Sequence, residues 1–258
     1  MNTIEYGQGA VNNTIGWGQG AKVGSSFSNT KSIALDGVDD FVDCGDNDNL
    51  SFGDGSSDSP FSISAWVKMD IVNNFIIVSK DATSQREYTF RMVNDTIRVF
   101  LLDNSSGGYI GRFYNSSLSS LQGVWSHFCF TYNGNSASNG VKIYLNATRV
   151  DDSNYQGGTY TAMENTLSNF NIGRQEISNL DGNGNIDEVS VFNSELSQSD
   201  ITAIYGSGVP NSLSSYSSLL SWWRCGDNDT SPTLTDNGSG GNNGTMTNFS
   251  TFSTDVPT

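Results

Sequence analysis

The segment from 184 to 205, GNIDEVSVFNSELSQSDITAIY, most constrains the fold because its apolar period changes within it. Its first half alternates with the period of two that is typical of a strand. We expect one face of this strand to carry Asp187, Val189 and Val191, and the other to carry Ile186, Glu188, Ser190 and Phe192. The segment therefore predicts a strand with an acidic pair near its middle.

The second half of this segment predicts a short helix. Ser197 can serve as the N-cap, and Asp200 stands at the third helical position of a capping box. Leu196 can pack against Ile201 across the cap, and Gly206 can end the helix. The other apolar runs of the chain have the pattern of strands, so we expect an all-β protein with one short helix.

The composition supports a β-sandwich and excludes some partners. The 258 residues include 28 Gly, and only 15% are charged, which suits many short strands joined by turns. The net charge of −15 disfavours binding to nucleic acid or to an anionic membrane surface, because both would repel the chain. No segment approaches the roughly 20 apolar residues of a transmembrane helix, so we expect no membrane insertion.

Three motifs carry a family resemblance. They are LDGVDDFVDCG at 35–45, WSHFCFTYNG at 125–134 and NIDEVSVF at 185–192. Together with the strand and its trailing helix, they resemble the laminin-G-like, concanavalin A-like lectin/glucanase jelly-roll family. The resemblance implies an all-β fold, an antiparallel two-sheet jelly-roll β-sandwich, over about residues 31–250.

Residues 1–30 are predicted to form a separate Gly/Asn-rich arm. The sequence YGQGA at 6–10 recurs as WGQGA at 17–21. One aromatic residue among glycines is not a core pattern, so the arm is either a flexible leader or a segment that docks onto a neighbouring subunit. The repeat is similar to Gly-Gln-Gly repeats of marine phage virion proteins.

The last part of the chain resembles the segment that usually begins such a domain. Residues 215–250 contain SLLSWWRCGDND and a Gly/Asn-rich stretch. We expect this segment to fold back onto the sandwich as a strand, because an unpaired apolar strand would leave an edge prone to aggregation. The alternative is that it begins another module. Residues 251–258 are expected to be a tail.

The acidic residues beside the first and last predicted strands suggest a structural calcium site. The resemblance implies that these strands are neighbours, which would let Asp36, Asp39 and Asp187 converge. Carboxylate oxygens suit calcium, which takes six to eight oxygen ligands. Asp40 and Glu188 are second choices. The alternative is that the aspartates only form a solvated turn.

Catalysis is not expected. The jelly-roll glucanase signature places Glu, Asp and Glu alternately along one strand, whereas this chain has Asn185, Asp187 and Val189. His127 is the chain's one histidine, and no Ser or Cys nucleophile can be assigned to it. We expect it to be a structural residue and the protein not to be an enzyme.

Four tyrosines in polar segments are candidates for carbohydrate binding. An aromatic ring can stack on the apolar face of a sugar while its hydroxyl stays in water. The candidate ligand-binding residues are Tyr109, Tyr114, Tyr155 and Tyr160.

One predicted hairpin departs from the family pattern. The family usually has Asn-Gly at its turn, and here the residues are Asn146 and Ala147. Alanine tolerates positive φ poorly, which argues against a tight two-residue turn.

Three cysteines cannot complete a disulfide framework. Cys129 lies in an apolar run and is expected to be a buried thiol. Cys44 and Cys225 lie in the similar contexts DCGDND and RCGDND, which leaves open whether they pair.

These features predict a non-catalytic adhesion or binding protein. The first 13 residues lack the basic and apolar stretches of a signal peptide. With the repeated arm and the acidity, this favours a phage virion surface protein, as a capsid decoration or fibre component. Such a protein would contact other virion proteins through its arm, would touch cell-surface glycans and could be a homo-oligomer. The alternative is an extracellular carbohydrate-binding module of a secreted bacterial adhesin or glycan-active enzyme.

Overall fold

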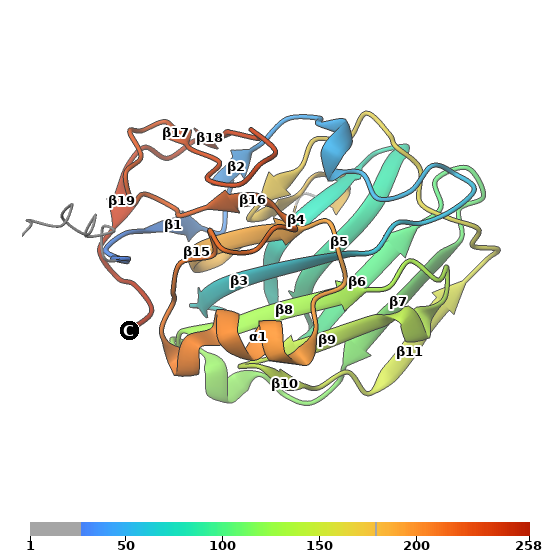
Figure 1. Ribbon diagram of the computed structural model, residues 1–258, viewed down its shortest axis with the longest axis horizontal. Helices are drawn as coiled ribbons and strands as arrows, with labels where there is room; N and C mark the ends of the chain where they lie inside the picture. Colours follow the sequence, from blue (N-terminus) through green and yellow to red (C-terminus); the bar gives the residue numbers. More distant parts are fainter. Residues whose placement is uncertain (1–26, 179) are drawn as a thin grey trace, which may run out of the picture.

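Runs that alternate apolar and polar residues become the strands of two antiparallel sheets, which pack face to face (Figure 1). The computed structural model describes residues 27–178 and 180–258. The predicted arm therefore lies outside the described residues, apart from its last four. The prediction of a jelly-roll sandwich with one short helix is confirmed.

The first sheet is built around a long central strand, β15 (Asn183–Phe192). Beyond its partner β3 (Phe61–Met69) lie β8 (Ser126–Tyr132), β9 (Val141–Leu145) and β10 (Thr148–Arg149). On its other side, β15 pairs with β1 (Ser32–Asp36) along one half and with β16 (Leu219–Trp223) along the other, and β1 pairs with β19 (Phe252–Ser253).

The second sheet is a meander of long strands extended by short ones. In spatial order it contains β11 (Ser153–Gly157), β7 (Tyr109–Tyr114), β6 (Thr96–Leu102), β5 (Gln85–Val93), β4 (Asn74–Ala82), β12 (Asn171–Ile172), β2 (Phe41–Asp43), β18 (Gly244–Thr247) and β17 (Thr233–Leu234). A small separate pair, β13 (Arg174–Gln175) and β14 (Leu180–Asp181), contacts β4.

The core lies between the two sheets and is rich in aromatic rings. Phe61 of β3 packs edge-on against Phe130 of β8, with 5.2 Å between ring centroids. It also contacts Tyr88 of the opposite sheet at 5.2 Å. All three rings are fully buried, and each burial contributes about 1.5–3 kcal/mol to folding. These contacts join β3 and β8 to β5.

A bulge in β15 overturns the predicted alternation of its side chains. The register with β3 shifts between Asp187 and Ser190, and Glu188 has a φ of +50°. One extra residue in a strand moves everything after it to the opposite face. Ile186 and Val189, which the sequence predicts on opposite faces, therefore both lie in the core between the sheets.

The predicted helix is confirmed as α1 (Gln198–Tyr205), with both halves of its capping box. The Ser197 Oγ accepts from the Asp200 N–H, and the Asp200 carboxylate accepts from the Ser197 N–H. Gly206 ends the helix with a φ of +59°. Ile201 and Ile204 pack into a second apolar cluster on the outer face of the first sheet, where Figure 1 shows α1 lying across it. Within residues 27–178 and 180–258, no helix is long and apolar enough to cross a membrane.

The C-terminal segment contributes strands to both sheets. Val189 pairs with Trp223 of β16, and Val42 pairs with Met246 of β18. In the stretch expected as a tail, Phe252 pairs with Ile33 of β1. The chain therefore returns beside its first strand, as Figure 1 shows.

All three cysteines are free thiols. Cys129 is buried, as predicted. Cys44 and Cys225 are also buried and form no disulfide.

The hairpin between β9 and β10 does use a tight two-residue turn, contrary to the expectation from sequence. Leu145 pairs with Thr148, and the two residues between them have φ values of +48° at Asn146 and +62° at Ala147. The turn is held because the Asn146 side chain accepts from the His127 N–H at 2.9 Å, and Ala147 O accepts from Gln198 of α1 at 2.8 Å. These contacts fix a conformation that alanine alone disfavours.

We therefore expect Ala147→Gly to stabilise the protein by about 1 kcal/mol, because glycine adopts positive φ without steric cost. Urea unfolding would measure this change. Ala137, which has a φ of −140°, provides the matched control. Ala137→Gly should destabilise the protein by about 0.5–1 kcal/mol. At this negative φ glycine relieves no strain, and it only increases the entropy of the unfolded chain. Equal destabilisation by both substitutions would contradict the strain at Ala147.

Candidate functional site

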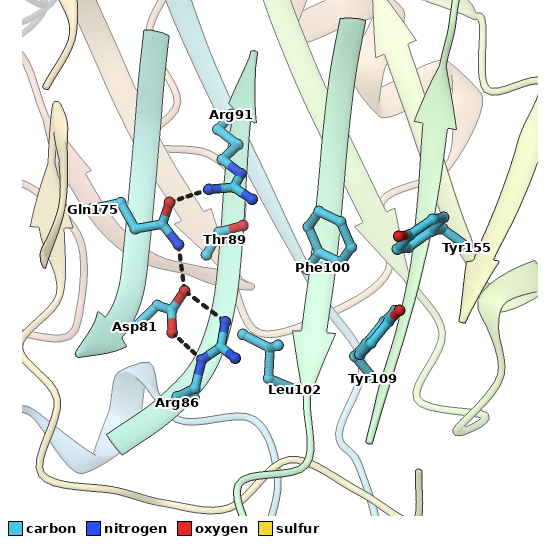
Figure 2. Close-up of a pocket in the computed structure, with 9 residues that line it drawn as sticks. All are labelled: Asp81, Arg86, Thr89, Arg91, Phe100, Leu102, Tyr109, Tyr155 and Gln175. Atoms are coloured by element: carbon cyan, nitrogen blue, oxygen red, sulfur yellow. Dashed lines mark hydrogen bonds and ion pairs between the residues drawn. The ribbon is translucent and has the colours of Figure 1, made fainter. Parts of the chain in front are cut away.

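A groove with a volume of about 210 Å³ lies on the outer face of the second sheet (Figure 2). Its position follows from strand alternation, because Tyr88, Phe90 and Met92 of β5 point into the core and leave Thr89 and Arg91 on the outer face. The groove is lined by Asp81, Arg86, Thr89, Arg91, Phe100, Leu102, Tyr109, Tyr155 and Gln175.

One wall of the groove is an aromatic cluster. The rings of Tyr109 and Tyr155 are stacked with 5.4 Å between centroids, and Phe113 stacks on Tyr155 at 4.6 Å. Phe100 meets Tyr155 edge-on at 5.5 Å. Gly111 pairs with Tyr155 on one side and Phe100 on the other, and its lack of a side chain leaves space for the rings to converge. Tyr155 remains 43% exposed, so the wall ends in an accessible ring.

The opposite wall is a chain of hydrogen bonds. Asp81 accepts from the Arg86 Nε at 2.7 Å and from its Nη2 at 3.4 Å. Gln175, on β13, donates its Nε2 to Asp81 and accepts from the Arg91 Nη1, as Figure 2 shows. The small β13–β14 pair thus positions one polar side of the groove above β4 and β5.

Two polar atoms at the floor of the groove lack a hydrogen-bond partner among the described residues. They are the Thr89 Oγ1 and the Arg91 Nε, both buried. Thr89 is 1% exposed. A buried polar atom that forms no hydrogen bond costs about 1–3 kcal/mol, so these atoms favour a bound polar group. An accessible ring facing unpaired polar atoms is typical of a ligand site.

The structure brings together two of the four predicted tyrosines. Tyr109 and Tyr155 share the groove, whereas Tyr114 packs against the core between the sheets. The Tyr160 hydroxyl donates to the Asp58 carboxylate at 2.7 Å, and its ring is partly buried against the same core. Sequence reasoning missed the polar wall. The TFRMV and IRVFLL segments could have indicated a charged outer face, because in each of them an arginine alternates with apolar residues.

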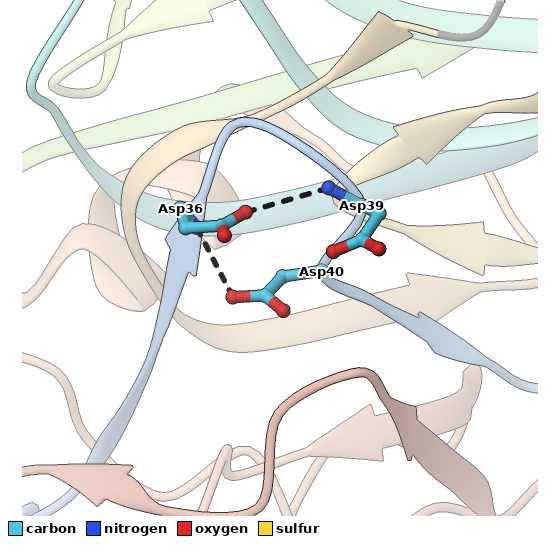
Figure 3. Close-up of side chains that lie close together, drawn as sticks. All are labelled: Asp36, Asp39 and Asp40. Carbon is cyan, nitrogen blue, oxygen red and sulfur yellow. Dashed lines mark hydrogen bonds between the residues drawn. The ribbon is translucent and has the colours of Figure 1, made fainter.

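Three of the predicted acidic residues form a surface cluster (Figure 3). Asp36, Asp39 and Asp40 each offer a carboxylate oxygen within 4.8 Å of the others. Asp40 accepts from the Asp36 N–H at 3.2 Å, and Asp36 accepts from the Val38 N–H at 2.8 Å. Burial and the neighbouring Asp36 charge raise the pKa of Asp40. Such an arrangement of oxygens can hold a hard cation.

Asp187 lies away from this cluster, although β1 and β15 are neighbours as the resemblance implies. Asp36 pairs with Asn183, and Asp187 lies four residues farther along β15, which is roughly 13 Å of strand. Asp187 is fully buried and accepts from the Asn29 side chain at 2.8 Å. The register of the pair therefore separates carboxylates that the sequence predicts to converge.

Glu188 is used in a separate buried network. Its carboxylate accepts from the Trp222 Nε1 and from the Arg224 Nε, the latter at 3.3 Å. The Arg224 guanidinium also lies over the rings of Phe27 and Trp222. Burial raises the pKa of Glu188 to about 7. The bulged acid is thus satisfied by neighbours and does not line the groove.

His127 is buried on the outer face of the first sheet. Its Nε2 lies 2.6 Å from the Ser64 Oγ, and burial lowers its pKa to about 3. Trp66 and Tyr205 of α1 lie against the imidazole ring. Because these neighbours bury it completely, the Ser64–His127 pair is closed to a substrate.

The sequence profile of the family described as the concanavalin A-like lectin/glucanases superfamily matches residues 43–202, more than half of the chain. No curated protein sequence matches the chain. A candidate carbohydrate binding protein from Bacteroides ovatus has a similar structure, with 18% identity and a TM-score of 0.59 over 90% of this chain. At that identity the similarity shows the fold alone, and this chain spans 62% of that protein's length.

Two further solved structures are more distant. A pentraxin from Limulus polyphemus has 15% identity and a TM-score of 0.44 over 69% of this chain and 82% of its own. Domains LG4-5 of the mouse laminin α1 chain have 10% identity and a TM-score of 0.43 over 63% of this chain and 41% of theirs.

Proposed function

Because the chain belongs to the concanavalin A-like lectin/glucanases superfamily, we propose that it is a non-catalytic carbohydrate-binding protein and that the groove on its second sheet is the binding site. The observation that carries this proposal is the partly exposed Tyr155 ring facing the buried, unpaired Thr89 hydroxyl across the groove. The Bacteroides ovatus protein, which shares the fold, is described as a candidate carbohydrate binding protein.

The two walls suit the two kinds of surface on a sugar. The apolar face of a pyranose ring would pack against the exposed edge of Tyr155, whose two faces are covered by Tyr109 and Phe113. Sugar hydroxyls would exchange hydrogen bonds with the Thr89 Oγ1 and donate to the Asp81 carboxylate. Each group is already held in place by its neighbours, which reduces the entropy lost on binding.

The groove does not favour hydrolysis. Cleavage of a glycosidic bond commonly needs two carboxyl groups on opposite sides of the bond. Among the described residues that line the groove, Asp81 alone has a carboxylate, and it is bonded to Arg86. We therefore assign the groove to binding.

We expect Tyr155→Ala to weaken glycan binding by roughly two- to tenfold, because contact with one aromatic ring is worth about 0.5–1.5 kcal/mol. A glycan array followed by calorimetry on the best ligand would measure this. Tyr155→Phe should retain most of the affinity, because the ring remains. Val209→Ala removes an exposed apolar side chain outside the groove and should leave binding unchanged. Equal affinity of wild type and Tyr155→Ala would reject the groove as the site.

We propose a virion surface as the setting, with the protein as a phage capsid decoration or fibre component. The repeated aromatic–Gly-Gln-Gly-Ala unit at 6–10 and 17–21 supports an arm that binds other virion proteins, and the net charge of −15 suits a protein exposed to salt water. In this setting the sandwich would be presented outward, as a monomer or homo-oligomer, to contact cell-surface glycans. A secreted bacterial adhesin or glycan-active enzyme is the competing setting.

Antibody labelling separates the two settings. We expect regular labelling of purified viral particles, viewed by electron microscopy. Medium from uninfected producer cells serves as the control. Labelling confined to that medium or to the cell surface would favour the secreted setting.

We also propose that Asp36, Asp39 and Asp40 hold a structural calcium ion. The donor set consists of carboxylate oxygens beside the Asp36-Gly37 turn, which suits calcium. An ion there would offset the repulsion that three neighbouring carboxylates produce.

Calcium at a concentration about 100 times its Kd should raise the melting temperature by roughly 5–10 °C relative to chelator-treated protein. Asp39→Asn should abolish most of this shift. Asp70→Asn, at another exposed aspartate, should preserve it. An identical melting temperature with and without calcium would exclude the ion.

A further inference from the structure

We infer that the carbohydrate bound in this groove carries a negative group, a carboxylate or a sulfate ester, which Arg91 and Arg98 hold between them. This inference rests on the proposed function and adds the chemical class of the ligand. An unusual pair of like charges lies on the outer face of the second sheet.

Arg91 and Arg98 are direct partners across β5 and β6, on the same face as the groove. Like charges that lie directly opposite each other destabilise a sheet. Neither arginine forms an ion pair with an acidic residue in the ranges 27–178 and 180–258. Arg91 donates to the Gln175 side chain, and the Arg98 Nε donates to the Thr96 Oγ1 at 2.9 Å, so the hydrogen-bond partner of each is neutral. The Asp81 carboxylate, which Gln175 also bonds, attracts Arg91 without forming an ion pair with it.

The other arginines of the chain differ in this respect. Each of them has a carboxylate within 4.0 Å: Arg86 has Asp81, Arg112 and Arg149 share Asp151, Arg174 has Asp181, and Arg224 has Glu188 and Asp227. The chain has 27 acidic residues against 12 basic ones, so carboxylates are abundant. The two arginines without a carboxylate partner are the two that face each other beside the groove.

Aromatic rings hold both guanidinium groups in place. The Arg91 guanidinium lies 5.5 Å from the centroid of Phe100, and the Arg98 guanidinium lies 4.9 Å from the centroid of Phe113. The two rings meet edge-on at 5.4 Å. A guanidinium stacked on a ring keeps its N–H edge free to bind a carboxylate or sulfate. The buried, unpaired Arg91 Nε is such a donor.

The two cations are also partly withdrawn from water. Burial lowers the pKa of both Arg91 and Arg98. An anionic group would relieve the repulsion between them and replace the lost solvation, whereas a neutral sugar would supply hydrogen bonds but leave the repulsion in place. The net charge of −15 disfavours a general attraction to polyanions, so local contacts must supply the affinity.

Paired glycans test this inference on the full chain. Polygalacturonic acid and its fully methyl-esterified form differ only in the carboxylate, and dextran sulfate and dextran differ only in the sulfate. We expect the anionic member of at least one pair to bind roughly ten times more tightly or better, as hydrogen bonds to charged groups typically allow. Which pair shows the difference identifies the anionic group.

Arg98→Gln is the most informative variant, because it removes both the repulsion between Arg91 and Arg98 and the proposed contact with the anionic group. It should weaken binding of the anionic glycan about tenfold without lowering the melting temperature, and Arg91→Gln should weaken it at least as much. Arg149→Gln removes the same charge on β10, in the other sheet, and should leave binding unchanged.

Three outcomes would overturn the inference. If Arg98→Gln and Arg149→Gln weaken binding equally, the effect is that of net charge alone. If the anionic and neutral members of each pair bind equally and Tyr155→Ala abolishes that binding, the groove is still the glycan site but its ligand need not be anionic. If the wild-type protein binds none of these probes and no glycan on the array, both this inference and the proposed carbohydrate-binding function are rejected.

Discussion

The antiparallel pairing of β15 with three other strands is the constraint on which the rest of the structure depends. β3 runs along one side of it, and β1 and β16 divide the other side between them. This arrangement places the beginning, the middle and the end of the described chain in one sheet. The bulge at Glu188 lies near the junction between the β1 and β16 pairings, and it allows Ile186 and Val189 to reach the same core. The bulged acid then binds Arg224, one residue beyond β16, which further fixes that strand.

The outer face of the second sheet is free to carry a ligand because the inward side chains of its strands supply their share of the core. In β5 and β6, Phe90 and Val99 fill the core and fix the register, so the outward positions between them need not be apolar. Those positions hold a polar wall on one side and an aromatic wall on the other. The groove is therefore the outer surface of strands whose inner surface is required for folding.

The local features of this fold could be predicted from sequence, whereas features that depend on distant pairing could not. The capping box at Ser197 and the glycine stop at Gly206 use contacts within nine residues, so their spacing alone predicts them. The bulge at Glu188 follows from how β15 must fit β3, and nothing in the period of IDEVSV indicates it. The same limit applies to the acidic residues, because the register of β1 against β15 decided which carboxylates meet. Gln175 reaches the groove from β13, a distant part of the sequence.

The distribution of arginines connects stability with binding in this acidic chain. A strand pair that served only the fold would gain by placing an acid opposite Arg91 or Arg98, since opposite charges across a strand pair stabilise it. The chain does this for Arg86 in the same groove, which lies directly opposite Asp81, and for Arg174, which lies opposite Asp181. Natural binding sites often retain groups that cost stability in the free protein, because a ligand supplies the missing partner. The two arginines that lack a carboxylate partner, on Phe100 and Phe113, have this character, and the partly exposed Tyr155 ring would give the proposed anionic sugar an apolar edge to pack against.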